Sequence, residues 1–303
     1  MEQRSLSPRS WVDLATVALF WGGSFLAIRL ALDSTGPHWV VALRCLGAFV
    51  LLLAFIRWRG LRLPTDAQSW AGFMALGLFN NAIPFTLITW AELTVPSGLA
   101  SIINASTAIF GVVIAAMVLA DERLTPRRLA GVLVGFAGVV IVIGPSLLGQ
   151  IDLTSVAQLA LVGAALSYAV SGPIGRRVGQ GLSPLVVATG MLGCSALITT
   201  VMAALVEGVP AVPTLTGGLA LLYLAAPSTA LAYLIYYRLL ATAGAGNTSL
   251  VTLLVAPIAV LLGALVLDEV LPLRAFAGFA AIGLGLLILD GRLLSRLRTR
   301  SPR

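Results

Sequence analysis

The sequence contains no lysine, only one histidine and only two cysteines, and charged residues make up 10% of its 303 positions. Soluble domains carry about 25% charged residues, so this scarcity argues against a water-soluble globular fold. Cys45 and Cys194 both fall inside apolar runs, where a thiol is ordinarily a small apolar residue. They predict neither a disulfide nor a metal site, and no cofactor is expected.

Acidic residues and histidine are absent from the middle of every long apolar run. A membrane protease or a metal-dependent membrane enzyme needs acids, bases or metal ligands at such depth, so this absence argues against both. A simple carboxylate proton relay is also unsupported. Any ion coupling would have to use a residue at the edge of a run, such as Asp13 or Glu92, or proceed by substrate exchange.

Apolar residues are abundant: they make up 59% of the chain, and the mean hydropathy is +1.01. Runs near the 17–25 residues that cross a bilayer as a helix predict an all-α membrane protein with ten transmembrane helices. The first run is too long for a signal-peptide core and lacks a small-residue cleavage site, so we interpret it as a retained span. The predicted spans are 12–32, 38–56, 68–90, 96–119, 126–144, 155–174, 184–206, 215–237, 247–267 and 273–289.

All 19 basic residues are arginine, and the formal net charge is +7. They lie in short clusters between the apolar runs, which suits membrane topology better than nucleic-acid binding. With a cytoplasmic N-terminus, sixteen of them lie in cytoplasmic segments, Arg274 alone lies outside, and Arg29 and Arg44 lie within spans. The positive-inside rule therefore predicts that both termini are cytoplasmic. The absence of lysine hints at a GC-rich bacterial genome, and hence at a bacterial cytoplasmic (inner) membrane.

The chain contains an internal repeat. A shift of 147 residues places Asp121-Glu122 on Asp268-Glu269, and it also aligns Arg127 with Arg274, Gly131 with Gly278 and Gly138 with Gly285. This predicts two five-helix halves, 11–144 and 155–290. An odd number of spans in each half inverts one half relative to the other, an arrangement that permits alternating access.

Several motifs resemble those of a known family. They are WGGSF at Trp21–Phe25, the stretches Asn80–Glu92 and Pro96–Asn104, and in each half an acidic pair followed by a glycine-containing span. Over about residues 11–290 the chain resembles the drug/metabolite transporter superfamily, in its ten-span branch with two EamA-type repeats. The resemblance implies a secondary carrier, often an exporter of amino acids or other metabolites. The second half departs from the first, because Ser167-Tyr168 stands near where WGG would fall.

The third span supplies the candidate binding residues Asn80, Asn81 and Pro84. A proline at position 84 frees the carbonyl of Asn80, four residues earlier. Two amides beside a freed carbonyl suit a zwitterionic or amide-bearing solute. The alternative is that the amides only repair the kink that the proline causes.

The fourth span carries Ser101 and Asn104 within a stripe of small residues at helical spacing. Such a stripe serves either as a packing seam between helices or as a cavity lining. The stripe consists of Ser97, Ser101, Asn104, Ala108, Gly111 and Ala115. In the ninth span, its counterpart, Thr248 and Thr252 are four residues apart and point the same way.

Other candidates come from the remaining central spans. Arg44 could pair with a substrate carboxylate, with Asp33 or with Glu92, because an ionisable residue within a span is a functional suspect. For the aromatic and proline candidates, packing or the interfacial aromatic belt is the alternative role. The further substrate-binding candidates are Trp21, Ser24, Tyr168, Ser171, Pro227 and Tyr233.

The sequence thus predicts a carrier of small polar or amphipathic metabolites, with a small-molecule solute and the lipid bilayer as its partners. Two alternatives stay open: a translocator of hydrophobic drugs or lipids with the same fold, and an enzyme acting on lipid phosphates. The second would use Arg123, Arg127 and Arg128 beside Asp121-Glu122, although membrane topology already accounts for these arginines. The sequence determines neither solute, direction, coupling ion nor oligomeric state.

Overall fold

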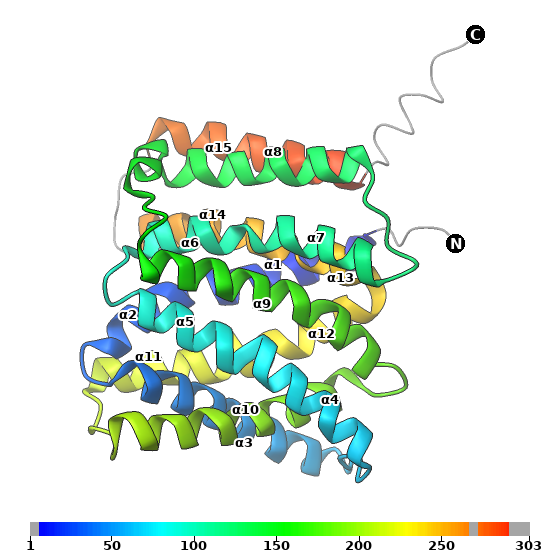
Figure 1. Cartoon of the computed structure of the whole chain (residues 1–303), viewed down its shortest axis with the longest axis vertical. Helices are drawn as coiled ribbons and strands as arrows, with labels where there is room; N and C mark the ends of the chain where they lie inside the picture. Colours follow the sequence, from blue (N-terminus) through cyan, green and yellow to red (C-terminus); the bar gives the residue numbers. More distant parts are fainter. Residues whose placement is uncertain (1–5, 267–271, 291–303) are drawn as a thin grey trace.

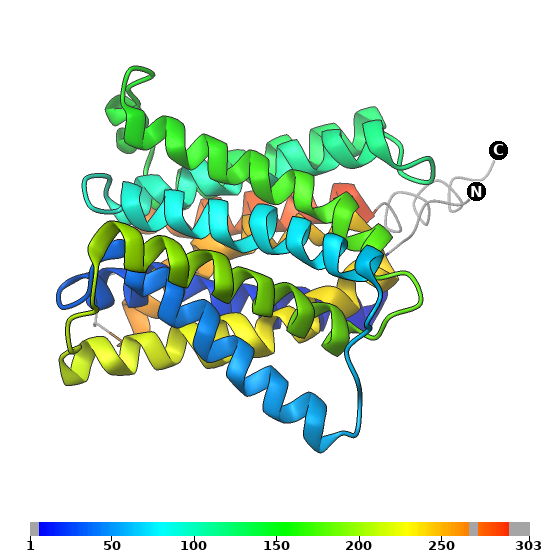
Figure 2. The same ribbon diagram turned by 60° about the horizontal axis from the view of Figure 1, so that its bottom comes forward.

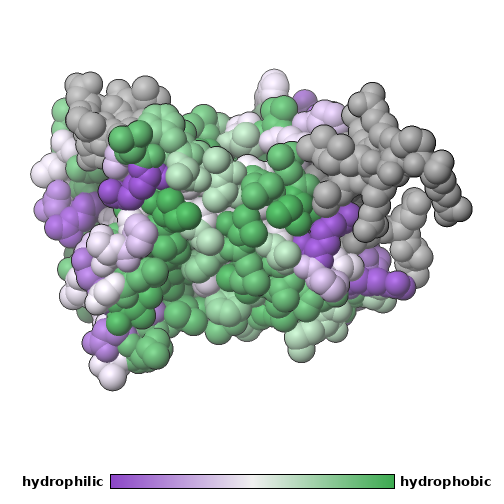
Figure 3. Space-filling model, turned by 90° about the horizontal axis from the view of Figure 1, so that it is seen from above, coloured by the Kyte–Doolittle hydropathy of each residue, from purple (hydrophilic) through white to green (hydrophobic). Residues whose placement is uncertain are grey.

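The computed structural model describes residues 6–266 and 272–290, and every regular element within these ranges is a helix. The helices lie alongside one another (Figures 1 and 2). Large apolar side chains such as Leu46, Leu166 and Leu197 are exposed on their outer faces. Figure 3 shows hydrophobic residues gathered over the middle of one face, with polar residues toward the two ends. A surface of this kind requires lipid as its solvent, so the predicted all-α membrane class is confirmed.

The helices of the first half are α1 (Pro8–Gly22), α2 (Ser24–Leu32), α3 (Pro37–Trp58), α4 (Ala67–Gly77), the π-helical turn η1 (Leu78–Ala82), α5 (Ile83–Ala91), α6 (Ser97–Ala105), α7 (Thr107–Val118) and α8 (Pro126–Ile143). A short 3-10 helix, η2 (Pro145–Gln150), follows. The second half contains α9 (Val156–Val178), α10 (Pro184–Glu207), α11 (Leu215–Ala225), the π-helical turn η3 (Ala226–Leu231), α12 (Ala232–Ala243), α13 (Ala245–Thr248), α14 (Val251–Val266) and α15 (Leu273–Asp290).

Eight helical segments of the described chain are long and apolar enough to cross a membrane, by length and composition. Two shorter apolar helices, Ala245–Leu261 and Leu273–Leu289, lie where the sequence predicts the ninth and tenth spans. That these two shorter helices also cross the membrane, which would give ten crossings in all, stays a prediction. The eight segments are Pro8–Leu32, Pro37–Trp58, Ala67–Ala91, Ser97–Val118, Pro126–Ile143, Val156–Val178, Pro184–Glu207 and Leu215–Ala243.

Side-chain caps determine where many of these helices begin. The hydroxyl of Ser7 accepts a hydrogen bond from the backbone N–H of Ser10, and Pro8 follows it as the first helical residue. A proline is favourable there because its missing N–H would have no intrahelical partner. Each such cap satisfies one of the backbone N–H groups that a helix leaves unpaired at its start. Similar caps begin α4, α8, α9, α10 and α11 at Asp66, Thr125, Ser155, Ser183 and Thr214.

Corresponding helices of the two halves run antiparallel. A Cβ atom placed on Gly285 of α15 would lie 2.6 Å from the carbonyl oxygen of Gly131 on α8. One placed on Gly138 of α8 would lie 2.8 Å from the carbonyl oxygen of Gly278 on α15. Since the earlier glycine of one helix meets the later glycine of the other, α8 and α15 have opposite directions, and only glycine permits so close an approach. The two helices lie side by side at one edge of the bundle (Figure 1).

The same relation holds for α3 and α10, which pack together at the opposite edge (Figure 1). The carboxylate of Glu207, the last residue of α10, accepts a hydrogen bond of 2.9 Å from the backbone N–H of His38, near the start of α3. The end of one helix therefore meets the beginning of its counterpart. The two halves are inverted relative to each other in the bundle, as the odd number of predicted spans requires. The residues Asp268-Glu269, which complete the sequence repeat, lie outside the described residues.

Several spans are interrupted near the middle of the bundle. In the third span of each half a π-helical turn breaks the α-helix, at η1 and at η3. The first span bends at Gly23, between α1 and α2, and the fourth at Ser106, between α6 and α7. Interrupted helices leave backbone groups without their usual partners, so such breaks are tolerated at membrane depth only where protein or a cavity surrounds them.

Candidate functional site

The proline in the third span has a definite consequence for the backbone before it. Pro84 lacks an N–H, and the preceding residues form the wider turn η1. The carbonyl of Phe79 accepts a hydrogen bond from the hydroxyl of Ser167 at 2.7 Å, and that of Asn80 accepts one from the hydroxyl of Tyr233 at 3.1 Å. The freed carbonyl of Asn80 was predicted to be available to a solute. In this structure Tyr233 occupies it instead.

The two neighbouring amides of η1 face different parts of the protein. The side-chain oxygen of Asn80 accepts a hydrogen bond from Ser171 at 2.8 Å, and Asn80 also lines a central cavity. Asn81 is completely buried against other helices, where its amide nitrogen donates to Ser195 at 2.7 Å and its oxygen accepts from Tyr233. Asn81 is therefore a packing residue, while Asn80 both bonds to a neighbouring helix and lines the cavity.

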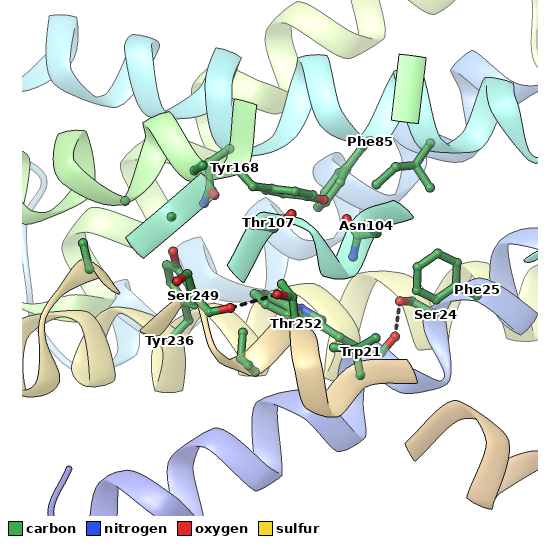
Figure 4. Close-up of a pocket in the computed structure, with 18 of the residues that line it drawn as sticks. Trp21, Ser24, Phe25, Phe85, Asn104, Thr107, Tyr168, Tyr236, Ser249 and Thr252 are labelled. Atoms are coloured by element: carbon green, nitrogen blue, oxygen red, sulfur yellow. Dashed lines mark hydrogen bonds between the residues drawn. The ribbon is translucent and has the colours of Figure 1, made fainter. Parts of the chain in front are cut away.

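The central cavity has a volume of about 70 Å³ and lies where the interrupted helices meet. A site of this size holds several water molecules, since one water needs roughly 10–15 Å³ measured in this way. Figure 4 shows side chains from both halves of the chain pointing into it. Those labelled in Figure 4 are Trp21, Ser24, Phe25, Phe85, Asn104, Thr107, Tyr168, Tyr236, Ser249 and Thr252.

Arg44 supplies a buried positive charge to the cavity wall. Its guanidinium donates from Nε to Thr229 at 2.7 Å and from Nη2 to Ser228 at 3.2 Å, and it lies 3.8 Å from the centre of the Phe85 ring. It forms no ion pair with Asp33 or Glu92, the two partners considered from the sequence, and no described residue accepts a hydrogen bond from Nη1. A guanidinium has five N–H donors, so donors remain for an anionic group in the cavity.

Two further polar atoms of the cavity wall lack partners. The side-chain oxygen of Asn104 on α6 and the hydroxyl of Thr107 on α7 are buried without a hydrogen bond to any described residue. Both side chains lie at the centre of the close-up (Figure 4). A buried polar atom without a partner is unfavourable by about 1–3 kcal/mol. A bound donor such as an ammonium group would remove this cost.

The structure separates the predicted site residues into three groups. Seven line the central cavity, two line a second, larger space that we call the lateral groove, and five are packed behind the cavity wall. Those that line the central cavity are Trp21, Ser24, Arg44, Asn80, Asn104, Tyr168 and Thr252. Those that line the groove are Ser101 and Pro227. Those packed behind the wall are Asn81, Pro84, Ser171, Tyr233 and Thr248.

The tyrosines of α12 face different parts of the protein. Tyr233, a candidate from the sequence, packs edge-on against Trp21 and bonds to η1. Tyr236, three residues later, lies 5.6 Å from the Trp21 ring and lines the cavity. Which tyrosine reaches the cavity depends on how α12 is rotated, and the sequence does not determine this.

Sequence reasoning also missed several lining residues. Thr107 is three positions after Asn104, so the helical spacing that singled out Asn104 could also have found Thr107. Gly111 belonged to the predicted small-residue stripe, and it lines the cavity while packing against Ser249. Both uses of the stripe, packing and lining, therefore occur together. No polar signal marked the aromatic side chain of Phe85.

The lateral groove has a volume of about 860 Å³ and is lined mainly by apolar side chains of α1, α2, α6, α11 and α14. Phe25 lines both the groove and the central cavity, so the two spaces adjoin at this ring. Tyr223 on α11 donates a hydrogen bond of 2.9 Å to the carbonyl of Phe20 on α1 and forms part of the groove wall.

Ion pairs gather at the end of the bundle where α1 begins and α15 ends, which we call the arginine-rich end. Arg176 on α9 makes a two-pronged contact of 2.8 and 2.9 Å with Asp121, and Arg128 on α8 bonds to Glu122 at 3.1 Å. The carboxylate of Glu122 also accepts the backbone N–H of Gly246, the residue after the cavity-lining Ala245. Arg238 on α12 pairs with Asp13 on α1. These contacts tie α1 to α12, and the residues before α8 to α9 and α13, at the arginine-rich end.

Comparison with known proteins identifies the family. The sequence profile of the EamA-like transporter family matches residues 12–144 and again residues 155–289. An uncharacterized transporter of Archaeoglobus fulgidus is 26% identical over 292 residues, which cover 92% of this chain and 98% of the relative. A probable terminal-alkyne amino-acid exporter of Streptantibioticus cattleyicolor is 26% identical over 300 residues, covering 98% of each chain. The uncharacterized inner membrane transporter YedA of Escherichia coli K12 is 29% identical over 216 residues, covering 70% of this chain and 68% of the relative.

The fold is shared with a solved crystal structure. That structure superimposes with a TM-score of 0.79 and 22% sequence identity, and the match covers 97% of this chain and 100% of the other. The two family matches together span nearly the whole sequence. The relative from Archaeoglobus fulgidus is named a transporter and is matched over almost its whole length, and YedA is named an inner membrane transporter. This chain is therefore an integral membrane protein that belongs to the EamA-like transporter family.

Proposed function

We propose that this protein is a secondary transporter that exports small amino-acid-like solutes from the cytoplasm by alternating access. The observation that carries the proposal is Arg44: a buried guanidinium at the wall of the central cavity, with Nη1 free of described partners. Its bonds to Ser228 and Thr229 and its contact with Phe85 hold the guanidinium in place. A carboxylate in the cavity would supply the missing charge.

The same cavity offers acceptors for a positively charged group. The unpartnered oxygens of Asn104 and Thr107 are suited to an ammonium, and the rings of Trp21 and Tyr236 provide an aromatic surface beside it. A zwitterion would thus satisfy both ends of the site. The relative in Streptantibioticus cattleyicolor, a probable terminal-alkyne amino-acid exporter, supports this class of solute and this direction.

The inverted halves support alternating access. Two antiparallel copies of one unit have two conformations of similar energy, each closed at one end of the bundle. The ion pairs of the arginine-rich end, including Asp121–Arg176, would have to separate before the cavity opens there. From the positive-inside rule we expect this end, with both termini, to face the cytoplasm of a bacterial cell.

The proposal is tested with purified protein in liposomes loaded with unlabelled amino acids. Saturable exchange of a labelled amino acid from a panel of aromatic and aliphatic species is the expected result. Arg44→Gln should reduce this exchange at least tenfold, while Arg57→Gln, which alters an exposed arginine on the same helix, α3, should leave it nearly unchanged. Exchange that does not saturate, or that survives Arg44→Gln, would contradict the proposal.

A second candidate function rests on the lateral groove. Its volume of about 860 Å³ and its apolar walls suit a hydrophobic drug or a lipid that enters the cavity past Phe25. Competition separates the two candidates. Inhibition of exchange by amino acids and not by an apolar cation such as tetraphenylphosphonium favours the first, and the reverse order favours the second.

A further inference from the structure

Glu92 is a buried carboxyl group that the proposed solute site does not use. It follows α5 directly and is only 3% exposed, and neither of its carboxyl oxygens has a hydrogen-bond partner among the described residues. Two other acids near the ends of the spans are engaged. Asp13 pairs with Arg238, and Glu207 accepts hydrogen bonds from the beginning of α3.

The position of Glu92 relates it to the transport path. Phe85 and Ile88 of α5 line the central cavity, and Glu92 lies seven and four residues after them. Residues with this spacing share one face of a helix. Glu92 therefore continues the cavity-lining face of α5 by one turn, toward the end of the bundle opposite the arginine-rich end.

The protonation state follows from this burial. An ionised carboxylate buried without a hydrogen bond is far more unfavourable than a neutral carboxylic acid in the same place. Burial raises the pKa of the Glu92 carboxyl to about 8, although the positive charges of Arg29 and Arg44 act in the opposite direction. In this conformation the group therefore holds a proton near neutral pH.

The groups around Glu92 come from three neighbouring helices. Arg29 on α2 and Arg44 on α3 are the charges that act on it. Of the remaining titratable groups, Asp33 directly follows α2, and His38, the second residue of α3, bonds to Glu207. Cys45 and Arg57 lie further along α3. On α9, which packs along α5, the titratable side chains are Tyr168, near its middle, and Arg176 and Arg177, at the arginine-rich end.

We propose that Glu92 is a proton-binding site of the carrier, whose carboxyl group is protonated while buried and releases that proton when its end of the bundle opens to water. The inference rests on the proposed carrier function, and it adds the proton as the ion linked to the conformational cycle. On opening, the O–H bond of the carboxylic acid breaks and the proton passes to water. After that end has closed and the arginine-rich end has opened, the carboxylate takes up a new proton that enters from the arginine-rich end through the central cavity. Each complete cycle thus carries one proton across the membrane.

Infrared difference spectroscopy of the purified, lipid-embedded protein tests the site without any solute. Between about pH 6 and about pH 10 the spectrum should lose the C=O band of a protonated carboxylic acid, with a midpoint near the raised value. Glu92→Gln should abolish this change. The matched control is Glu207→Gln, which removes another acid at the same end of the bundle and should keep the change. A band that persists in Glu92→Gln, or a spectrum with no such titration, would overturn the proposal.

A transport measurement then separates this proposal from the proposed function. Protein in liposomes that enclose a pH-sensitive dye is exposed to the amino-acid panel, and both labelled exchange and internal pH are followed. We expect proton movement with solute in the wild type, and exchange without proton movement in Glu92→Gln. Wild-type exchange with no proton movement would overturn the coupling and leave the carrier function intact. A titrating Glu92 in a protein that moves no amino acid would overturn the proposed function instead.

Discussion

The hydroxyl of Tyr233 lies 3.1 Å from the carbonyl oxygen of Asn80 and also bonds to the side-chain oxygen of Asn81. These contacts join the third span of one half to the third span of the other. Both spans contain a π-helical turn at this level, η1 and η3. A direct hydrogen bond between the halves therefore joins η1 to α12, the helix that follows η3.

Removal of that hydroxyl should weaken the fold. In Tyr233→Phe the ring still fills its buried place, but two buried oxygens lose their donor. We expect a loss of about 1–2 kcal/mol in unfolding free energy, seen as a lower Tm of the purified protein. Tyr236→Phe is the matched control, because no described residue bonds to the Tyr236 hydroxyl. An equal fall in Tm for both variants would show that the bond to η1 is unimportant.

The two amides Asn104 and Asn81 should respond differently to truncation. Asn104→Ala removes an unpartnered oxygen from the cavity wall, so amino-acid exchange should fall about tenfold with little change in Tm. Asn81→Ala breaks the bonds to Ser195 and Tyr233 and should lower Tm more than it alters the solute concentration at half-maximal exchange. Exchange rate and Tm are measured on the same preparations. The reverse pattern would show that the cavity is misplaced.

The glycine seam between α8 and α15 should not tolerate a methyl group. In Gly285→Ala the new Cβ would lie 2.6 Å from the carbonyl oxygen of Gly131 and from the backbone nitrogen of Gly135, which cannot move aside without displacing a helix. Overpacking of this kind costs about 1–3 kcal/mol, so Tm should fall. Gly283→Ala, on the same helix, is the control, because a Cβ there meets no described atom within 4 Å. A Gly285→Ala protein as stable as Gly283→Ala would contradict the close antiparallel contact.

Loss of the pair between Asp121 and Arg176 should favour opening of the arginine-rich end. The measurement uses Ala245→Cys, a cavity-lining position, in a background with both native cysteines replaced by alanine. A water-soluble maleimide should label this cysteine several-fold faster when Arg176→Gln is added. Arg177→Gln, which changes the exposed neighbouring arginine, should leave labelling unaltered. Equal labelling rates in all three proteins would mean that the ion pair does not restrict access.

Stability should depend on pH through Glu92. The pKa of this carboxyl is raised from 4.5 in the unfolded chain to about 8 in the folded protein, so the folded state holds its proton more tightly. The stability that this proton contributes is fully present below the unfolded value and is lost as pH rises through the folded one. Tm should therefore fall between about pH 5 and about pH 9, and Glu92→Gln should reduce that fall. An equal or steeper fall in Tm in the variant would show that another group is responsible.

Much of the architecture was predictable because it depends on local properties of the chain. Apolar runs of membrane length, arginine clusters between them and the repeat at 147 residues indicate spans, their orientation and two related halves. The same repeat aligns Gly131 with Gly278 and Gly138 with Gly285, the glycines that meet across the α8–α15 seam. Their contact was not predicted, because it requires the two halves to be folded against each other.

The candidate site was predictable only in part. Polar residues within apolar spans are rare, and this rarity singled out Arg44, Asn80 and Asn104, all of which line the cavity. It also singled out Asn81 and Thr248, which the structure packs behind the cavity wall. The rarity of polar residues within apolar spans marks such a residue as important, but it does not show whether the side chain faces the cavity or another helix.

The sequence by itself determined that this chain is a helical membrane protein made of two related halves, since hydropathy, charge and repetition act along the chain. Only the tertiary structure decided which side chains share the cavity. One residue along a helix turns the side chain by about 100°, so Asn80 reaches the cavity while Asn81 faces α10. The rotation of each helix is set by contacts with helices distant in sequence, as Tyr233 on α12 shows where it bonds to η1. For the same reason the lack of a partner for Glu92 became visible only once its neighbours were in place.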